Sequence, residues 1–299
     1  MIQHLLQLIW NQRKQNAWLW AELLLVSVFL WFLVDYLYVM GRTYTAPLGF
    51  DIRHTYSIVI SSLSERSPDY IPKEKRERPD GVHLLTALDR IRTYPGVESA
   101  CLTDGGMPYY MGSRNLVWRI DTLQVPCRYA FVTPEFFDVF RIYDKDGKTA
   151  SLKRAIEDNN SIVISADVET MNPGLSLLGQ KAYRGNVTDE IEETIRGISV
   201  PIRRHEYTKA EPNVYRALRL SRMEEGYYEG MIDAVRLCVR VRPDVDNADF
   251  PARFRKDMAE QLRLGNLYLL DVQPLSYIRD GYIRSIGVEN EVKARVAVA

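Results

Sequence analysis

One apolar segment near the N-terminus constrains this chain more than any other feature of its sequence. Residues 17–40 read AWLWAELLLVSVFLWFLVDYLYVM, and Glu22 and Asp35 are the charged residues among them. A helix of about 24 residues is roughly 36 Å long, which is enough for a hydrocarbon core of about 30 Å. The stretch between the two acids is too short to span alone, so they must lie near the two interfaces. We therefore predict a transmembrane helix over residues 17–40.

The ends of this segment favour an uncleaved membrane anchor. Trp18 and Trp20 at one end, with Tyr36 and Tyr38 at the other, suit the headgroup regions. The two acids are better explained by solvation at the interfaces than by the alternative role of proton or ion ligands. A cleaved signal peptide is the alternative for the whole segment, but no small-x-small cleavage site precedes Pro47. Because a long following domain translocates largely regardless of local charge, we expect the N-terminus to be cytoplasmic.

The first residues form a pattern of their own. Apolar side chains recur at helical spacing at Ile2, Leu5, Leu6 and Ile9. This spacing predicts an amphipathic helix within residues 1–16, lying along the cytoplasmic side of the membrane. An N-terminal extension of the membrane helix is an equally open alternative.

The composition excludes several classes of protein. The 299 residues include 39 basic and 39 acidic side chains, so the formal net charge is zero, and 46% of the residues are hydrophobic. These values argue against disorder. A nucleic-acid partner is also disfavoured, because phosphate binding needs a basic excess. We expect no nucleic acid among the partners.

The water-exposed part is predicted to be α+β, with a strand–helix–strand unit at each end. The first unit has strands at 54–62 and 97–103 around a helix at 82–91, and the second has strands at 235–241 and 266–272 around a helix at 250–264. Two such units can pair into one split β-α-β sheet of the ferredoxin-like kind. We therefore predict a subdomain made of residues 49–104 and 231–282.

The region between these units, residues 105–230, is predicted to be an inserted, strand-rich subdomain. Its expected strands are 115–120, 125–132, 161–165, 196–203 and 214–220, and its expected short helices are 134–140 and 166–171. In the first of these helices Phe136, Phe137 and Phe140 follow helical spacing, which indicates a core face.

A search for chemistry gives no catalytic, cofactor-binding or metal-binding residues. Gly147-Lys148-Thr149 ends like a phosphate-binding loop, but Ile142 stands where that loop needs glycine. His4, His54, His83 and His205 are scattered without metal-ligand spacing, and no GxSxG nucleophile sequence occurs.

The three cysteines are too few for a disulfide scaffold. Cys101 and Cys127 fall in predicted strands and could pair in an oxidising compartment, which would leave Cys238 alone. The odd number of cysteines favours the alternative of buried, unpaired thiols.

The ordered segments resemble the N-terminal part of a MacB/FtsX-type ABC transporter permease with a MacB-like periplasmic core domain. The residues that carry the resemblance are WNQRK at 10–14, YPGVESA at 94–100, RYAFVTPEFFDVF at 128–140, SIVIS at 161–165 with LGQK at 178–181, and the strand within 196–204. They are similar, in the same order, to the family's entry into the first membrane helix, its PGV turn, its strand leading to an FF helix, its VVIS…GK segment and its next strand.

This resemblance implies a role and a set of partners. The chain would be a permease subunit in the bacterial inner membrane, single-pass in this form, with most of its residues in the periplasm. It would not be an enzyme, because a separate cytoplasmic ABC ATPase would drive it in export or extraction of a substrate. It would act as a homodimer or as a heterodimer with a second permease.

Such permeases have further membrane helices, so residues 283–299 would start the helix that leads to a missing second span. The alternative function is a single-span, membrane-anchored periplasmic sensor or binding protein. An anchored periplasmic enzyme is disfavoured, because no catalytic set of residues is found.

Overall fold

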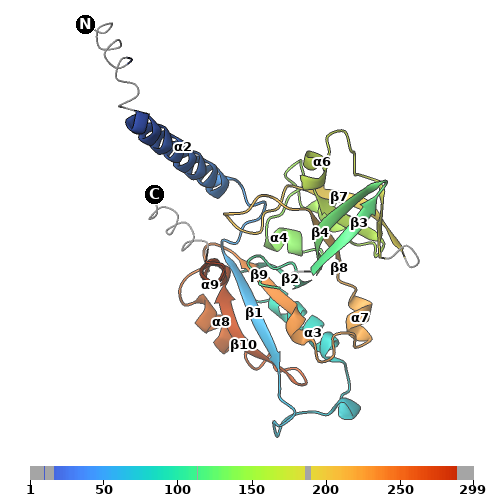
Figure 1. Cartoon of the computed structure of the whole chain (residues 1–299). Coiled ribbons are helices and arrows are strands. Elements are labelled where there is room, and N and C mark those ends of the chain that lie inside the picture. The colour runs from blue at the N-terminus through green and yellow to red at the C-terminus, as the bar shows by residue number, and fades with distance from the viewer. Residues whose placement is uncertain (1–9, 11–16, 113, 186–189, 288–299) are drawn as a thin grey trace. The chain divides into compact units, whose positions relative to one another are not determined.

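The computed structural model describes Trp10 and residues 17–112, 114–185 and 190–287 (Figure 1). Helix α2 (Ala17–Thr45) belongs to one unit of the chain, and Pro47–Glu289 form a second, compact unit. Among the described residues, α2 is the helix that is long and apolar enough to cross a membrane, with a mean hydropathy of 2.2. The predicted helix at 1–16 lies outside the described residues, apart from Trp10, which is helical and exposed.

Helix α2 is longer than the sequence predicted. It continues through Gly41 to Thr45, whose hydroxyl donates a 3.0 Å hydrogen bond to the Gly41 carbonyl. It stops just before Pro47, because proline disfavours helical backbone in the residue that precedes it. None of its residues is buried, so its Leu, Val, Phe and Trp side chains are free to face lipid.

The strands β10 (Leu267–Pro274), β1 (Thr55–Ser62), β9 (Val235–Val241) and β2 (Val97–Asp104) form an antiparallel sheet in that order, here called the open sheet. Alternate residues Tyr56, Ile58 and Ile60 of β1 enter one hydrophobic core. Helices α3 (Asp80–Arg92) and α8 (Phe250–Met258) supply the other side of that core through Leu84 and Phe254, among others. Both helices therefore cover the same face of the open sheet.

A second set of strands closes on itself. The strands β4 (Leu123–Val132), β3 (Arg114–Ile120), β6 (Lys181–Arg184), β7 (Ile191–Ser199), β5 (Ser161–Ser165) and β8 (Asn213–Ala217) pair in this order, and β8 pairs back to β4 in parallel. We call this closed ring the barrel. Its interior holds Trp118, Ile120, Ile162 and Ile195, all fully buried.

The open sheet and the barrel share a third core. Strand β2 pairs with β4 at Thr103–Val132 and Asp104–Phe131. On the face of the open sheet opposite α3 and α8, Phe136, Phe137 and Phe140 of the segment around α4 (Phe136–Val139) are fully buried against β2, β4 and β8. The predicted core role of the three phenylalanines is confirmed.

The remaining elements connect these parts. They are η1 (Lys73–Lys75), α5 (Ala150–Ala155), α6 (Asp167–Met171), α7 (Leu220–Glu224), η2 (Ile232–Ala234) and α9 (Leu275–Ser285). The unit is thus α+β, as predicted. Because residues 47–289 form one compact unit, the predicted boundaries at 104/105 and 230/231 stay predictions.

Three predicted elements need correction. The strand expected at 196–203 lies at Ile191–Ser199, because Pro201 cannot extend the ladder and the inward-facing Glu193 hides the strand's alternation. The helix expected at 250–264 ends at Met258, before Gly265 turns the chain with a φ of 57° into β10. The helix expected to start at 283 starts at Leu275 as α9 and ends at Ser285, and residues 286–287 form a turn in which Gly287 has a φ of 67°. Residues 288–299 of that prediction lie outside the described residues.

Candidate functional site

The histidines and cysteines are distributed without a metal centre. Within the described ranges, no group of three or more His, Cys, Asp or Glu side chains is placed to hold a metal ion. His54, His83 and His205 lie on separate parts of the unit, at the start of β1, on α3 and after β7.

The cysteine pair considered from the sequence is wrong. Cys127 lies in the barrel core, whereas Cys101 lies in the core shared by the open sheet and the barrel. The residue opposite Cys101 is Cys238, on β9. All three thiols are free and buried, which agrees with the alternative of buried, unpaired thiols that the odd number of cysteines favoured.

A histidine–aspartate pair escaped the sequence analysis. Nδ1 of His54 lies 2.5 Å from a carboxylate oxygen of Asp246, and the Tyr56 hydroxyl donates to the other oxygen. Burial, and then this bond to Asp246, raises the pKa of Tyr56. Ser276 lines the same open surface hollow, but no hydrogen bond joins it to His54 in the described part of the chain. The pair instead anchors His54, whose φ is 57°, to the loop after β9.

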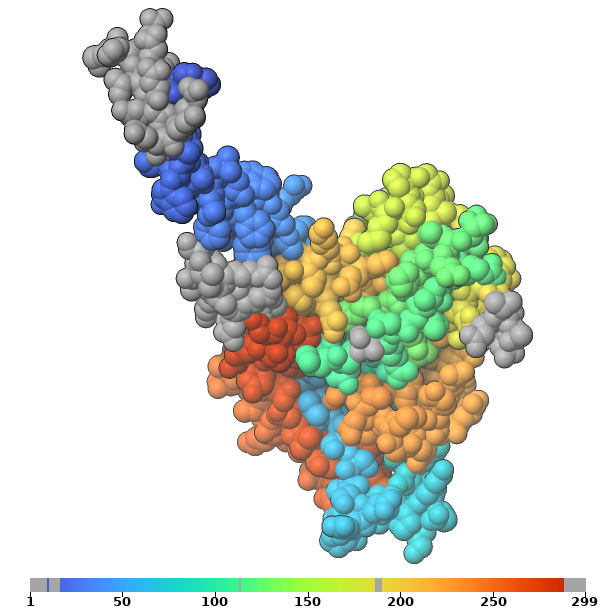
Figure 2. All heavy atoms as spheres, in the orientation of Figure 1, coloured from blue at the N-terminus to red at the C-terminus, as the bar shows by residue number. Residues whose placement is uncertain are grey.

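A groove rich in arginine lies where β3, β4 and β8 meet the segment around α7. Its volume is about 240 Å³, and its lining includes Arg114, Arg184, Arg216, Arg219, Arg222, Tyr129, Phe131, Tyr227 and Tyr228. Figure 2 shows the atoms of the α7 segment in orange beside the green atoms of β3 and β4. We call this the arginine groove.

Carboxylates neutralise the inner wall of the arginine groove. Glu193, whose side chain is 1% exposed, lies 2.5 Å from Nη2 of Arg216 and 3.3 Å from Nε of Arg184. Trp118 donates its indole N–H to the same carboxylate at 3.3 Å. Asp104 pairs with Arg114 at 2.8 Å. These contacts fix the walls of the groove. Among the described residues Arg219 and Arg222 have no ion-pair partner; Arg219 donates to the Asn159 carbonyl at 3.5 Å and Arg222 lies over the ring of Tyr227.

A second, smaller pocket lies on the other side of β4. Arg128 and Ala130 line it, whereas Phe131 lines the arginine groove, because successive residues of a strand face opposite sides. Tyr129 borders both cavities. Arg204 and Asn213 also line it, and Asn213 is the register partner of Arg128 across the parallel β4–β8 pair. We call this the Arg128–Arg204 pocket.

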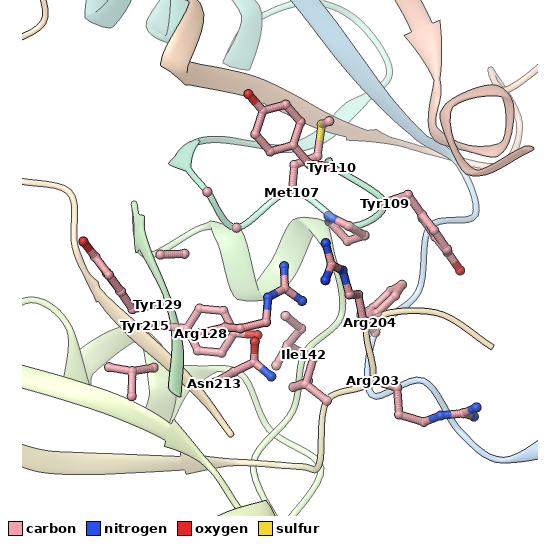
Figure 3. Close-up of a pocket in the computed structure, with 17 residues that line it drawn as sticks. Met107, Tyr109, Tyr110, Arg128, Tyr129, Ile142, Arg203, Arg204, Asn213 and Tyr215 are labelled. Atoms are coloured by element: carbon pink, nitrogen blue, oxygen red, sulfur yellow. The ribbon is translucent and has the colours of Figure 1, made fainter. Parts of the chain in front are cut away.

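The two guanidinium groups of this pocket lie close together. Figure 3 shows those of Arg128 and Arg204 side by side, while Arg203 points away from them. Burial, and then the charge of Arg204, lowers the pKa of Arg128. The Nε atoms of both arginines are shielded from solvent and make no hydrogen bond within the described structure. The pocket therefore contains donors and positive charge, and no carboxylate occurs among its described lining residues.

The sequence analysis missed both arginine sites for a local reason. Arg128 and Arg216 occur in strands that alternate between faces, where a charged residue normally indicates the solvent side. A signal was present, because YAFV directly after Arg128 and NVY directly before Arg216 are apolar enough to suggest a strand covered on both faces. The approach of Arg204 has no local signal, since it depends on how the loop after β7 returns to β8.

Comparison with known proteins gives structural neighbours. No protein-family model and no curated protein matches the chain. A domain of a protein described as a permease, from Porphyromonas gingivalis, aligns with 18% identity and a TM-score of 0.47, over 76% of this chain and 92% of that one.

Two further neighbours are transporter domains. The periplasmic region of MacB from Actinobacillus actinomycetemcomitans aligns with 9% identity and a TM-score of 0.42, over 82% of this chain and 97% of that one. The extracellular domain of the noncanonic ABC-type transporter YknZ from Gram-positive bacteria aligns with 12% identity and a TM-score of 0.41, over 72% of this chain and 100% of that one. These neighbours are domains of permease or ABC-type transporter proteins, which is the class that the sequence resembles.

Proposed function

We propose that this chain is a permease subunit of a MacB/FtsX-like ABC transporter, anchored by α2, with Pro47–Glu289 outside the cytoplasm. One observation carries the proposal: an apolar helix that passes directly into a compact α+β unit with a strand–helix–strand segment at each end. The ordered sequence resemblance supports the same conclusion independently. The open sheet would be the split ferredoxin-like subdomain, of residues 49–104 and 231–282, and residues 105–230 the inserted one.

In this proposal the unit performs no chemistry of its own. A separate cytoplasmic ATPase binds and hydrolyses ATP, and a second permease, identical or different, completes the membrane pathway. The unit outside the membrane then moves during export or extraction of a substrate. The shared core between the open sheet and the barrel supports movement as one body, because close-packed side chains resist sliding.

Cysteine labelling in intact bacteria tests the topology. The native cysteines are buried, so single cysteines can be introduced as Gln12→Cys and Lys75→Cys, the latter at an exposed position of η1. A membrane-impermeant maleimide is expected to label the Lys75→Cys protein alone. Labelling of the Gln12→Cys protein alone would place the compact unit in the cytoplasm and refute the proposal.

Co-purification tests the partner. The full chain, solubilised in mild detergent, is expected to recover an ATPase subunit encoded beside it and to bind no ATP itself. A chain that binds ATP at micromolar concentration without a partner would instead support the anchored-enzyme alternative.

A further inference from the structure

The Arg128–Arg204 pocket holds two like charges close together, and none of its described lining residues is a carboxylate. Each guanidinium carries its charge at any physiological pH, because arginine has a pKa above 12. Burial of such a charge is costly unless an opposite charge or a set of acceptors accompanies it. Arg128 experiences both burial and the repulsion of Arg204, and both effects lower its pKa.

The neighbouring groups do not supply that counter-charge. Glu211 attracts Arg128 electrostatically, yet within the described residues no carboxylate comes within ion-pair distance of Arg128 or Arg204. Arg204 lies 6.0 Å from the ring of Tyr282, a contact that offers a weak partner at most. The Nε atoms of both arginines stay buried without an acceptor.

In the arginine groove the guanidinium groups do have carboxylate counter-charges, although the Nε of Arg184 is likewise buried without a hydrogen bond. There Arg184 and Arg216 share the buried carboxylate of Glu193, and Arg114 pairs with Asp104. The Arg128–Arg204 pocket has the same donors, but its lining, as far as the structure describes it, contains no such acid. An anion from outside the chain would complete it.

We propose that the Arg128–Arg204 pocket binds an oxyanion group, a carboxylate or a phosphate, held between the two guanidinium groups. The planar fork of each arginine matches the paired oxygens of either group. The cavity volume of about 40 Å³ is larger than one water requires but suits a single anionic group rather than a whole metabolite. This assignment goes beyond the transport role and does not depend on it.

Anion titration of the purified full chain in detergent tests the proposal. Inorganic phosphate and acetate are added in separate arms at constant ionic strength, with chloride as the balance, and the unfolding temperature and the heat of binding are recorded. Saturable stabilisation is expected in at least one arm. Saturation by both anions assigns a general oxyanion site, and saturation by phosphate alone assigns a phosphate site. No saturable effect of either anion beyond that of chloride would overturn the proposal.

Variants locate the site. Arg128→Gln and Arg204→Gln are each expected to weaken binding by about tenfold or more, because a hydrogen bond to a charged group is lost. Arg242→Gln is the matched control, since Arg242 is 58% exposed and pairs with the exposed Asp244. Unchanged affinity in both pocket variants would overturn the proposal.

Stability in chloride alone separates an anion site from a structural role. Removing one of two facing like charges is expected to leave the unfolding temperature of Arg128→Gln equal to or above that of the wild type. A lower unfolding temperature, with no anion response in the wild type, would identify the arginines as structural. Arg204→Lys keeps the charge without the fork, so it provides a folded comparison if a glutamine variant does not fold.

Discussion

Cys101 on β2 lies directly opposite Cys238 on β9, and both side chains are fully buried in the same core. Opposed residues of antiparallel strands have Cα atoms about 4.5–5.5 Å apart, which is within the range that a disulfide spans. Their side chains also share one face of the sheet. The fold therefore brings together a cysteine pair that is far apart in the sequence.

Refolding of the full chain in a glutathione redox buffer is expected to link Cys101 to Cys238 and to leave Cys127 as a thiol. Peptide mapping by mass spectrometry without reduction identifies the link. Cys101→Ser is expected to remove every intramolecular disulfide. A link from either residue to Cys127 would contradict the register of β2 and β9.

Before such oxidation, the native thiols are expected to resist alkylation. Burial raises the pKa of Cys127 to about 12, and burial, followed by the neighbouring Cys238, raises that of Cys101. Because the thiolate is the reactive form, iodoacetamide at pH 8 should modify no cysteine until denaturant is added. Stoichiometric reaction of any thiol in the folded chain would show that the cores are open.

The buried carboxylate of Glu193 is expected to be important for stability. Glu193→Gln leaves Arg216 and Arg184 without their shared charge, and breaking a buried pair costs about 3–5 kcal/mol. Chemical denaturation of the full chain in detergent, followed by near-UV circular dichroism, measures the loss. The neighbouring Glu192→Gln is the control, because Glu192 is 49% exposed and its pair with Lys181 is solvated. Equal effects of the two changes would contradict the buried network.

The ion pair between Glu206 and Arg279 is expected to make the stability of the unit depend on pH. Burial alone would raise its pKa, but the hydrogen bond and charge of Arg279, at 2.5 Å, bring the pKa below its usual value. A carboxyl group with a lowered pKa stabilises the fold above its unfolded pKa of about 4.3, and this stabilisation is lost as the pH falls through the folded value.

The free energy of unfolding of Glu206→Gln should therefore be lower than that of the wild type at pH 7, and the gap should narrow below about pH 4.3. Asp280→Asn removes the other, 58% exposed partner of Arg279 and serves as the control. A gap for Glu206→Gln that is constant from pH 7 to pH 3 would show that the pair carries no pH dependence.

Replacing either of two helical glycines by alanine is expected to change the stability of the unit in opposite directions. A Cβ at Gly81 on α3 would lie 2.4 Å from the backbone oxygen of Met223 on α7, so Gly81→Ala should destabilise the unit by about 1–3 kcal/mol. A Cβ at Gly281 on α9 meets nothing within 4 Å, so Gly281→Ala should stabilise it by up to about 1 kcal/mol. Urea midpoints distinguish the two variants. Equal midpoints would mean that α3 and α7 do not pack as described.

Local patterns predicted much of the fold and little of the site. The strands expected at 235–241 and 161–165 coincide with β9 and β5, because alternation or a continuous apolar run is a local signal. The parallel β4–β8 pairing that closes the barrel joins distant segments and leaves no such signal. For the same reason the sequence could not place Arg204 beside Arg128.

The short helix α4 lies where the open sheet and the barrel meet. Rings of Phe136 and Phe137 lie 5.5 and 5.6 Å from Tyr215 of β8, and the same core includes Cys101 of β2. A force applied to the open sheet or to the barrel is therefore transmitted to the other part through side chains that are in direct contact. Pro47–Glu289 would therefore respond to a force as one rigid body, and not as two parts joined by a flexible linker.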